Sequence, residues 1–379
     1  MRICIVYDCL YPYTIGGAER WYRDLARELV AQGHQVTYLT RMQWEPGAEV
    51  QPTGVEVVSV IGPRELYDES GRRQIDEAIL FGLGVFRHLL RHGRRYDVVH
   101  TASFPYFSLL GAATLRPLGR YRLAVDWHEL WSQAYWRDYA GPLKGQLGWL
   151  VQRLCLRPRQ EAICFSRLHE RRLREQGVNG DIVRLSGQYV GGAPEPRPPA
   201  EEPTVLYAGR QLPEKRVLSL PPALALARER IPALRAQLFG DGPDHRALVC
   251  AIEERGLAGA VEAPGFVPVE QLANALPAAL CLVLPSRREG YGRIVVEAAA
   301  AGVPSVVVDG DENAAVELVE EGVNGFVAAS DDPAELARAI VSVHEAGTAL
   351  RESTLAWYAA NAERLSLESS LQRVTELYR

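Results

Sequence analysis

Lysine is almost absent from this chain of 379 residues, because only Lys144 and Lys215 occur among its 42 basic residues. No apolar run approaches the roughly 20 residues that a membrane-spanning helix needs, and the N-terminus becomes charged too soon for a signal peptide. The Gly-x-Gly-x-x-Gly fingerprint of dinucleotide-binding domains is missing as well. We therefore expect a cytoplasmic protein, and the rarity of lysine makes its two positions candidates for function.

The cysteines and histidines give no sign of disulfide bonds or of a metal site. The six cysteines include no Cys-x-x-Cys pair, and they form no metal-ligand spacing with the eight histidines. We therefore expect reduced, buried thiols and no bound metal. The cysteines are Cys4, Cys9, Cys155, Cys164, Cys250 and Cys281.

Charge is distributed unevenly along the chain. The net charge of -5 argues against a general nucleic-acid binder. Residues 1–190 carry 25 Lys and Arg against 20 Asp and Glu, whereas residues 191–379 carry 17 against 27, so the halves have charges of +5 and -10. A basic first half favours contact with an anionic substrate or with a membrane surface.

Short apolar strand patterns alternate with helix patterns along the whole chain, which predicts α/β domains with parallel sheets. A proline-rich segment at residues 187–202 interrupts this alternation and is typical of a domain boundary. The length is sufficient for two hydrophobic cores. We therefore expect one domain over residues 1–190 and a second over residues 200–360.

The most informative stretch is a strand–loop–helix–strand unit at residues 281–309, which implies a parallel sheet. Its loop contains Gly290 and Gly292, and its helix carries Glu297 in an almost wholly apolar sequence. A carboxylate there needs a partner, and the free N–H groups of the helix N-terminus favour phosphate. Glu297, and Glu289 in the loop, can each accept two hydrogen bonds from a vicinal diol. The stretch predicts a site for a diphosphate between two sugars, unless both acids are merely solvated.

A second loop carries two cations, Arg210 and Lys215, after the strand predicted at residues 203–208. The C-terminal ends of strands carry the ligand site in open α/β sheets. An arginine fork and a lysine point charge can converge on one diphosphate. The alternative explanation is a solvated loop.

Two features of the first half are candidates for substrate contact. Gly16 and Gly17 precede a predicted helix, where they allow an anion to approach the backbone, although a tight turn explains them equally well. His128 lies in the polar cluster at the end of the strand predicted at residues 123–129, where it can hydrogen-bond a sugar hydroxyl, although a histidine there is more often structural. A helix predicted at residues 72–91 ends in arginines that compensate its dipole, with membrane attachment as the alternative.

Together these motifs resemble the retaining nucleotide-sugar glycosyltransferases of the GT-B fold, family four. The second half contains Gly-Arg-x4-Lys, Gly-Asp-Gly-Pro, Glu-Gly-Tyr-Gly-x4-Glu-Ala and Glu-Gly-x-Asn-Gly-Phe in the family's order. The likeness in the first half is looser, and Leu185 to Tyr189 replace the family's Pro-Asn-Gly-Val. The resemblance implies an α/β protein with two Rossmann-like, doubly wound domains facing a central cleft. It also implies a C-terminal helix, residues 361–379, that crosses back to the first domain.

The resemblance further implies a role for each candidate residue. Arg210 and Lys215 would hold the donor diphosphate, and Glu297 would bind the ribose. Glu289 would bind the donor sugar, and His128 would contact that sugar near its anomeric carbon. The other donor-binding residues that it implies are Gly16, Gly17, Gly240, Phe266, Val267, Gly290, Tyr291, Gly292, Arg293 and Ile294.

The implied reaction moves a hexose from a UDP or GDP sugar to a hydroxyl of a glycan, a lipid or a natural product, with retention of configuration. It needs neither a metal ion nor a cofactor, since the nucleotide sugar is a substrate. No nucleic-acid partner is expected, whereas peripheral contact with the inner face of a membrane remains an option. Two other functions stay open: a nucleotide-sugar epimerase, which has no acceptor, and a non-catalytic nucleotide-sugar-binding relative.

Overall fold

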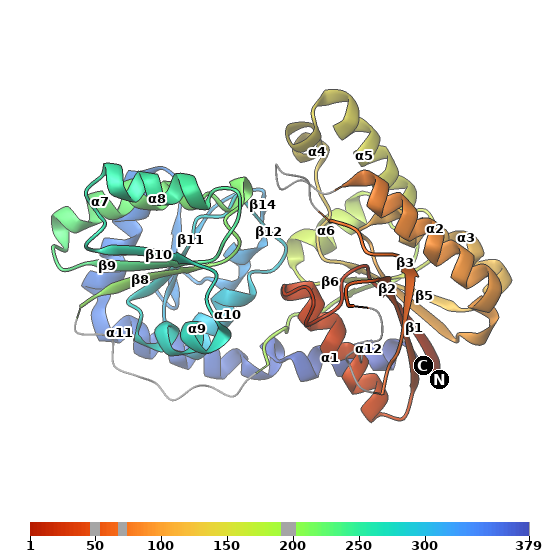
Figure 1. Ribbon diagram of the computed structural model, residues 1–379. Helices are drawn as coiled ribbons and strands as arrows, with labels where there is room; N and C mark the ends of the chain where they lie inside the picture. The colour runs from red at the N-terminus through yellow and green to blue at the C-terminus, as the bar shows by residue number, and fades with distance from the viewer. Residues whose placement is uncertain (46–53, 67–73, 191–201, 379) are drawn as a thin grey trace. The chain divides into compact units, whose positions relative to one another are not determined.

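The computed structural model describes residues 1–45, 54–66, 74–190 and 202–378, and the chain forms two compact units (Figure 1). Unit 1 comprises Met1–Ser186 with Glu368–Arg379, and unit 2 comprises Gly187–Leu367. Each unit has a parallel sheet of its own with helices packed on it, as the α/β prediction required. Most of the predicted proline-rich boundary falls on residues 191–201, outside the described residues.

The sheet of unit 1 has the order β3-β2-β1-β4-β5-β6-β7, and all its neighbouring strands are parallel. The order reverses between β1 and β4, and ligands of doubly wound domains bind beyond the strand ends at such a point. The strands are β1 (Arg2–Val6), β2 (Gln35–Arg41), β3 (Glu56–Ile61), β4 (Val98–Ala102), β5 (Arg122–Trp127), β6 (Glu161–Cys164) and β7 (Ile182–Arg184).

The helices of unit 1 bury apolar faces against this sheet around a core that includes Leu39, Phe81, Val99 and Trp127. The C-terminal segment α12, from Glu368 onward, belongs to the same unit. The helices are α1 (Gly17–Ala31), α2 (Ile75–His92), η1 (Gly93–Arg95), α3 (Tyr106–Gly119), α4 (Gln133–Ala140), α5 (Pro142–Cys155), α6 (Arg167–Glu175) and α12 (Leu367–Leu377).

The sheet of unit 2 has the order β10-β9-β8-β11-β13-β15, again parallel, with its reversal between β8 and β11. A separate two-stranded sheet pairs β12 with β14. The strands are β8 (Thr204–Ala208), β9 (Arg235–Phe239), β10 (Val261–Gly265), β11 (Cys281–Leu284), β12 (Arg288–Glu289), β13 (Ser305–Val308), β14 (Glu312–Asn313) and β15 (Gly325–Ala328).

Helices flank the second sheet, and the longest of them, α11, bends at Gly347, where φ is 59°. The resemblance implies one C-terminal helix over residues 361–379, but Ser366 interrupts it and separates α11 from α12. The helices are η2 (Pro213–Lys215), η3 (Val217–Ser219), α7 (Leu220–Arg230), α8 (His245–Glu254), α9 (Val269–Ala275), η4 (Leu276–Ala278), α10 (Arg293–Ala300), η5 (Ala314–Leu318) and α11 (Pro333–Leu365).

The edge strand β15 begins inside the Glu-Gly-x-Asn-Gly-Phe motif and was not predicted from the sequence. Gly325 pairs with Ser305 of β13, and a Cβ on Gly325 would lie 1.9 Å from the Ser305 carbonyl oxygen. The glycine therefore permits close strand pairing rather than chain reversal alone.

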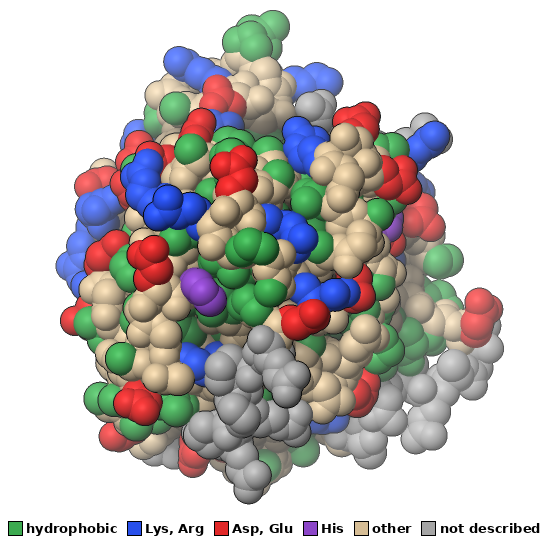
Figure 2. Space-filling model, turned by 90° about the vertical axis from the view of Figure 1, so that its left-hand side faces the viewer, with side chains coloured by type: hydrophobic (Ala, Val, Ile, Leu, Met, Phe, Trp, Pro, Cys, Tyr) green, Lys and Arg blue, Asp and Glu red, His purple; other side chains and the backbone are tan. Residues whose placement is uncertain are grey.

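The surface shows no large field of one charge on the face displayed in Figure 2, where acidic and basic side chains are interspersed with hydrophobic ones. The expectation of buried thiols is wrong for Cys250, which is exposed on α8, and correct for the other five cysteines. Within the described ranges, the helices are all too short or too polar to cross a bilayer.

Candidate active site

Lys215 and Glu289, predicted from separate motifs, meet in unit 2. The Lys215 Nζ lies 2.6 Å from the Glu289 Oε1, and the Ser286 hydroxyl donates to the same oxygen at 2.8 Å. The two charged side chains are only 18% and 14% exposed. This ion pair joins the end of η2 to the short strand β12.

A second ion pair holds the same two segments together. The Arg288 guanidinium lies 2.7 Å from the Glu214 carboxylate, and the Arg287 amide donates to the Glu214 carbonyl at 2.8 Å. Sequence reasoning missed Glu214, Ser286 and Arg288. Their signal was the reversed charge order of Glu214–Lys215 and Arg288–Glu289, which allows two crossed pairs.

Helix α10 begins at Arg293, shortly after these residues in the chain. Its N-cap is Gly292, whose φ of 92° disfavours any residue with a side chain, and whose Cβ would lie 2.7 Å from that of Ala315. The N-cap glycine has no side chain to cap the first turn, and the Val295 N–H donates to the Gly292 carbonyl at 2.9 Å. The N–H groups of Arg293 and Ile294 are the ones that this helix N-terminus offers to an anion. Tyr291 is buried, and its side chain therefore serves packing while its backbone lies at the helix entrance.

Glu297 has the partner that its apolar helix demands. The Arg293 Nε lies 3.0 Å from the Glu297 Oε1, one helical turn away, and the two side chains are 16% and 20% exposed. An arginine in the first turn opposes the helix dipole. A bound anion at this end would therefore stabilise Arg293 as well. The adjacent Ile294 is half-buried.

Arg210 follows β8 with an exposed side chain, and its carbonyl accepts a hydrogen bond from Tyr207 at 2.9 Å. Burial and the nearby Glu289 raise the pKa of Tyr207, so this phenol stays a neutral donor. Gly240 keeps the loop after β9 close to the loop that holds Arg210, because a Cβ there would lie 1.8 Å from the Gly209 carbonyl oxygen.

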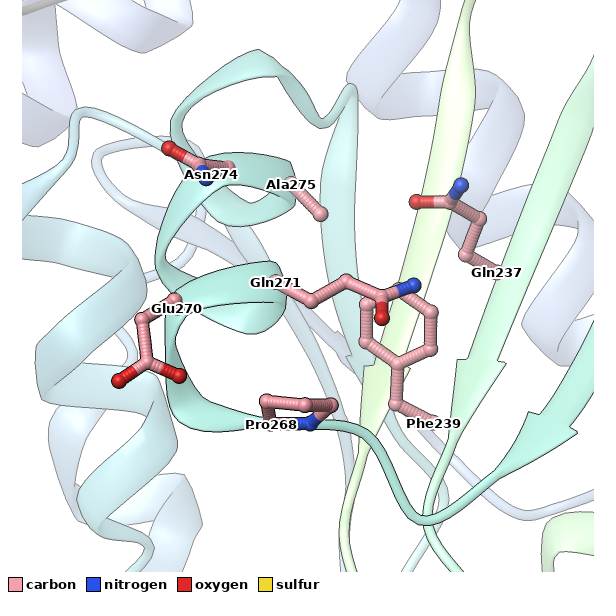
Figure 3. A pocket seen from close by; sticks show the side chains of 7 residues that line it. All are labelled: Gln237, Phe239, Pro268, Glu270, Gln271, Asn274 and Ala275. Carbon is pink, nitrogen blue, oxygen red and sulfur yellow. The ribbon is translucent and has the colours of Figure 1, made fainter.

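A groove of about 580 Å³ lies between α9 and strand β9, and Figure 3 shows its lining side chains. Phe239 and Gln271 are among them, while Glu270 points away from Phe239. Phe266 and Val267, predicted as donor-binding residues, come just before the groove residue Pro268 and do not line the groove. Phe266 is 69% exposed, so its ring is open for stacking.

In unit 1, a buried carboxylate connects the segments that carry the predicted residues. Asp126 accepts a hydrogen bond from the Trp21 indole of α1 at 2.7 Å, and its other oxygen lies 2.9 Å from the His100 Nε2. Burial alone would raise the pKa of Asp126, but the charge and hydrogen bond of His100 hold it below its usual value. His100 in turn contacts the hydroxyl of Tyr378, next to α12. Sequence reasoning missed this network.

Gly16 and Gly17 lie at the start of α1 and differ in what they require. Gly16 is the N-cap, and a Cβ there would lie 2.4 Å from a carboxylate oxygen of Glu19. A Cβ on Gly17 would meet nothing within 4 Å. Packing therefore explains the first glycine but not the second.

His128 is the first residue after β5, since this strand ends at Trp127. Its ring stacks on Phe165 with centroids 5.0 Å apart, and its Nε2 is buried without a hydrogen-bond partner in the described structure. Burial lowers the pKa of His128 despite the nearby acids Asp126 and Glu129, so the ring is held neutral. A neutral imidazole with an unpartnered nitrogen is suited to a hydroxyl ligand.

Among the described residues, no three His, Cys, Asp or Glu side chains are grouped so that they could hold a metal ion. The polar groups of the site are instead ion pairs and helix N–H groups. Both suit an anionic ligand with several oxygen atoms.

Family models match both units. Residues 193–357 match the model described as "Glycosyl transferases group 1", and residues 16–187 match the "Glycosyl transferase 4-like domain". The chain belongs to the group 1 glycosyltransferases. A group 1 glycosyltransferase uses a nucleotide-sugar donor, and the anion-binding features of unit 2 agree with that use.

Relatives of this glycosyltransferase differ in the share of their own length that the chain matches. A glycogen synthase of Mycobacterium tuberculosis is 25% identical over 361 residues, which are 90% of this chain and 86% of the relative. An exopolysaccharide phosphotransferase of Streptomyces coelicolor is 33% identical over 146 residues, 38% of this chain but only 15% of that protein.

Solved structures place the glycosyltransferase in the GT-B fold. Sucrose-phosphate synthase from Thermosynechococcus elongatus superposes with a TM-score of 0.81 at 20% identity, covering 100% of this chain and 98% of that one. The Anabaena protein HepE in complex with UDP-glucose gives a TM-score of 0.72 at 20% identity, with coverages of 100% and 99%.

Proposed function

We propose that the chain is a retaining glycosyltransferase that moves a hexose from a UDP or GDP sugar to a hydroxyl of a glycan, a lipid or a natural product. The observation that carries this proposal is the Lys215–Glu289 pair, beside the uncapped N-terminus of α10. It combines a cation for phosphate, a carboxylate for sugar hydroxyls and free helix N–H groups within one unit.

The donor roles follow from this geometry. Lys215, Arg210 and the first turn of α10 bind the diphosphate, and Glu289 accepts hydrogen bonds from the sugar. The ion pair at 2.6 Å holds Lys215 in place before the donor arrives, so little side-chain freedom is lost on binding. Glu297 binds the ribose hydroxyls, with Arg293 fixing its carboxylate.

The chemical step breaks the bond between the anomeric carbon and the diphosphate and forms a bond from that carbon to the acceptor oxygen on the same face. The acceptor proton passes to the departing diphosphate oxygen, so no separate general base is required. The cations and the helix N-terminus stabilise the charge that develops on the leaving group, which is commonly the largest contribution to such catalysis. In unit 1, taken by itself, Gly17 and the neutral His128 are candidates for contact with a substrate.

The UDP-glucose complex of HepE favours a UDP sugar, and the glycogen synthase relative favours a glycan hydroxyl as acceptor. A calorimetric panel of UDP, GDP and TDP sugars tests donor binding. We expect one nucleotide to bind and Lys215→Ala to weaken it at least a hundredfold. Lys144→Ala, at the other lysine of the chain, is the matched control and should bind like the wild type. Equal affinities of wild type and Lys215→Ala would contradict the proposal.

Two measurements separate transfer from the alternatives. The epimerase would turn over the donor without an acceptor, whereas a transferase requires one for efficient turnover. Proton NMR of the first product formed should show the anomeric configuration of the donor. EDTA should leave the rate unchanged, because cations of the chain neutralise the diphosphate. Donor binding without any turnover would instead indicate the non-catalytic relative.

A further inference from the structure

Helix α5 presents a row of leucines to solvent. Leu143, Leu147, Leu150 and Leu154 are 86%, 63%, 51% and 46% exposed. Their spacings of four, three and four residues place them on one face of the helix. Single exposed leucines need no explanation, but a continuous apolar row usually marks a binding surface.

The opposite face of α5 is firmly packed, so the orientation of the helix is well determined. A Cβ on Gly145 would lie 2.2 Å from the Trp136 carbonyl oxygen, and one on Gly148 would lie 2.5 Å from the Trp136 ring. The buried Gln152 accepts hydrogen bonds from the Trp136 indole and the Tyr106 hydroxyl, each at 3.0 Å. The leucines therefore cannot turn inward without breaking this packing.

Cations accompany the leucines, and acids do not. Residues 139–160 contain four basic residues and no Asp or Glu. All four are exposed, and within the described part of the chain none forms an ion pair, unlike Arg174 of α6, which pairs with Glu170 at 2.7 Å. Unpaired cations beside an apolar row complement a surface that is both anionic and apolar. The four are Lys144, Arg153, Arg157 and Arg159.

A second copy of this chain is a poor partner for the same face. The leucine spacing is that of a coiled-coil seam, in which Lys144 and Arg153 would flank the contact. Pairing α5 with itself would bring these cations against cations, which is unfavourable. An anionic surface would instead attract these cations.

We infer that the leucine face of α5 docks on the surface of an anionic lipid bilayer. The leucines enter the apolar boundary while Lys144 and Arg153 remain at the headgroups. The Arg153 guanidinium lies over the Trp149 ring at 5.2 Å, a combination of residues typical of membrane interfaces. Helix α2, suggested for this role by the sequence, also exposes Ile75, Ile79, Leu83 and Leu90, but it carries the exposed Asp76 beside them in its first turn.

Flotation with vesicles tests this surface without any substrate. The full chain is mixed with vesicles of phosphatidylcholine alone, or with 30% phosphatidylglycerol, at low salt and at 0.5 M salt. We expect binding to the anionic vesicles that weakens at least tenfold in high salt. Leu147→Ser/Leu150→Ser and Lys144→Glu/Arg153→Glu should each reduce it at least tenfold.

The control is Leu226→Ser on α7 of unit 2, which removes a leucine that is 39% exposed and should leave vesicle binding unchanged. Melting temperatures equal to the wild type establish that the double variants are folded. Absence of wild-type binding to anionic vesicles would overturn the inference. The inference would also be overturned if the wild type is a dimer, and if Leu147→Ser/Leu150→Ser makes it a monomer while vesicle binding stays the same. The calorimetric test of nucleotide-sugar binding does not depend on the outcome of these vesicle experiments.

Discussion

At the scale of single residues, Gly17 has no internal reason to be glycine, because a Cβ there would meet nothing within 4 Å. We expect Gly17→Ala to leave the melting temperature within about 1 °C of the wild type, since exposed changes away from special features cost little. If substrate approaches the backbone here, the methyl group should lower kcat/KM at least tenfold. Thermal unfolding and initial rates measure the two effects.

Gly259 provides the matched control for Gly17, because it too has open space around its missing Cβ and lies outside the candidate site. Gly259→Ala should change neither stability nor rate. A Gly17→Ala variant as active as the wild type would show that no substrate comes near this backbone.

His88 gives a prediction about pH. Burial, with the neighbouring His92 and Arg95, lowers the pKa of His88 from 6.5 to about 4. Between these pH values the unfolded chain binds a proton that the folded chain does not, so the free energy of unfolding falls as the pH drops through this window. We expect His88→Gln, which can still bond to the Tyr96 hydroxyl, to weaken this pH dependence.

The measurement is the melting temperature at pH 7 and at pH 5 for each variant. His344→Gln, at an exposed position of α11, should keep the pH dependence of the wild type. If His88→Gln keeps the pH dependence of the wild type, a group other than His88 binds the proton that destabilises the fold.

At the scale of elements, the sequence predicted the strands best where they were apolar and bounded by glycine or proline. Strand β11 and helix α10 both fall within the strand–loop–helix–strand unit predicted at residues 281–309 for this reason. Strand β15 was missed because its four residues follow a glycine-rich turn, and short edge strands carry little pattern. The charges of Lys215 and Glu289 were visible in the sequence, but their 2.6 Å contact depends on a loop geometry that no local pattern encodes.

The segment that departs from the family pattern shows why another part could not be predicted. Tyr189 forms a bridge with Ser366, the residue that ends α11, through hydrogen bonds to Leu365 and Leu367. A Cβ on Gly187 would lie 2.0 Å from the Ser366 carbonyl oxygen. This contact joins residues nearly 180 positions apart, so it leaves no periodic signal in either segment.

The side chain of Tyr378 helps to hold helix α12 in unit 1. The Tyr378 hydroxyl contacts the Nδ1 of His100, and both residues are almost completely buried. Tyr378→Phe keeps the ring but leaves this nitrogen without its partner. We expect the free energy of unfolding to fall by about 1–3 kcal/mol, the usual cost of a buried unsatisfied group.

Chemical denaturation measures this loss. Tyr13→Phe, at a tyrosine that is 38% exposed, should change the stability by less than about 0.5 kcal/mol. A neutral Tyr378→Phe would show that apolar packing of α12, and not the His100 contact, keeps it in place.

At the scale of the whole molecule, each unit has its own parallel sheet and its own buried core. Val99 and Phe81 belong to the first, and Val283 and Val306 to the second. Domains built in this way can unfold as separate cooperative units. The principal donor-binding candidates lie in unit 2, so a bound nucleotide should stabilise that unit selectively.

Calorimetry should therefore resolve two unfolding transitions, and UDP should raise only one of them. A ligand at a hundred times its Kd contributes about 2.7 kcal/mol, which corresponds to roughly 5–10 °C for a unit of this size. Hydrogen exchange identifies the shifted transition, because peptides from β8 and α10 should gain protection whereas those from β4 and β5 should not. Lys215→Ala should keep both transitions but lose the shift. A single unfolding transition would refute the independence of the two units. If UDP raised its temperature equally in the wild type and in Lys215→Ala, the role of this lysine would be refuted as well.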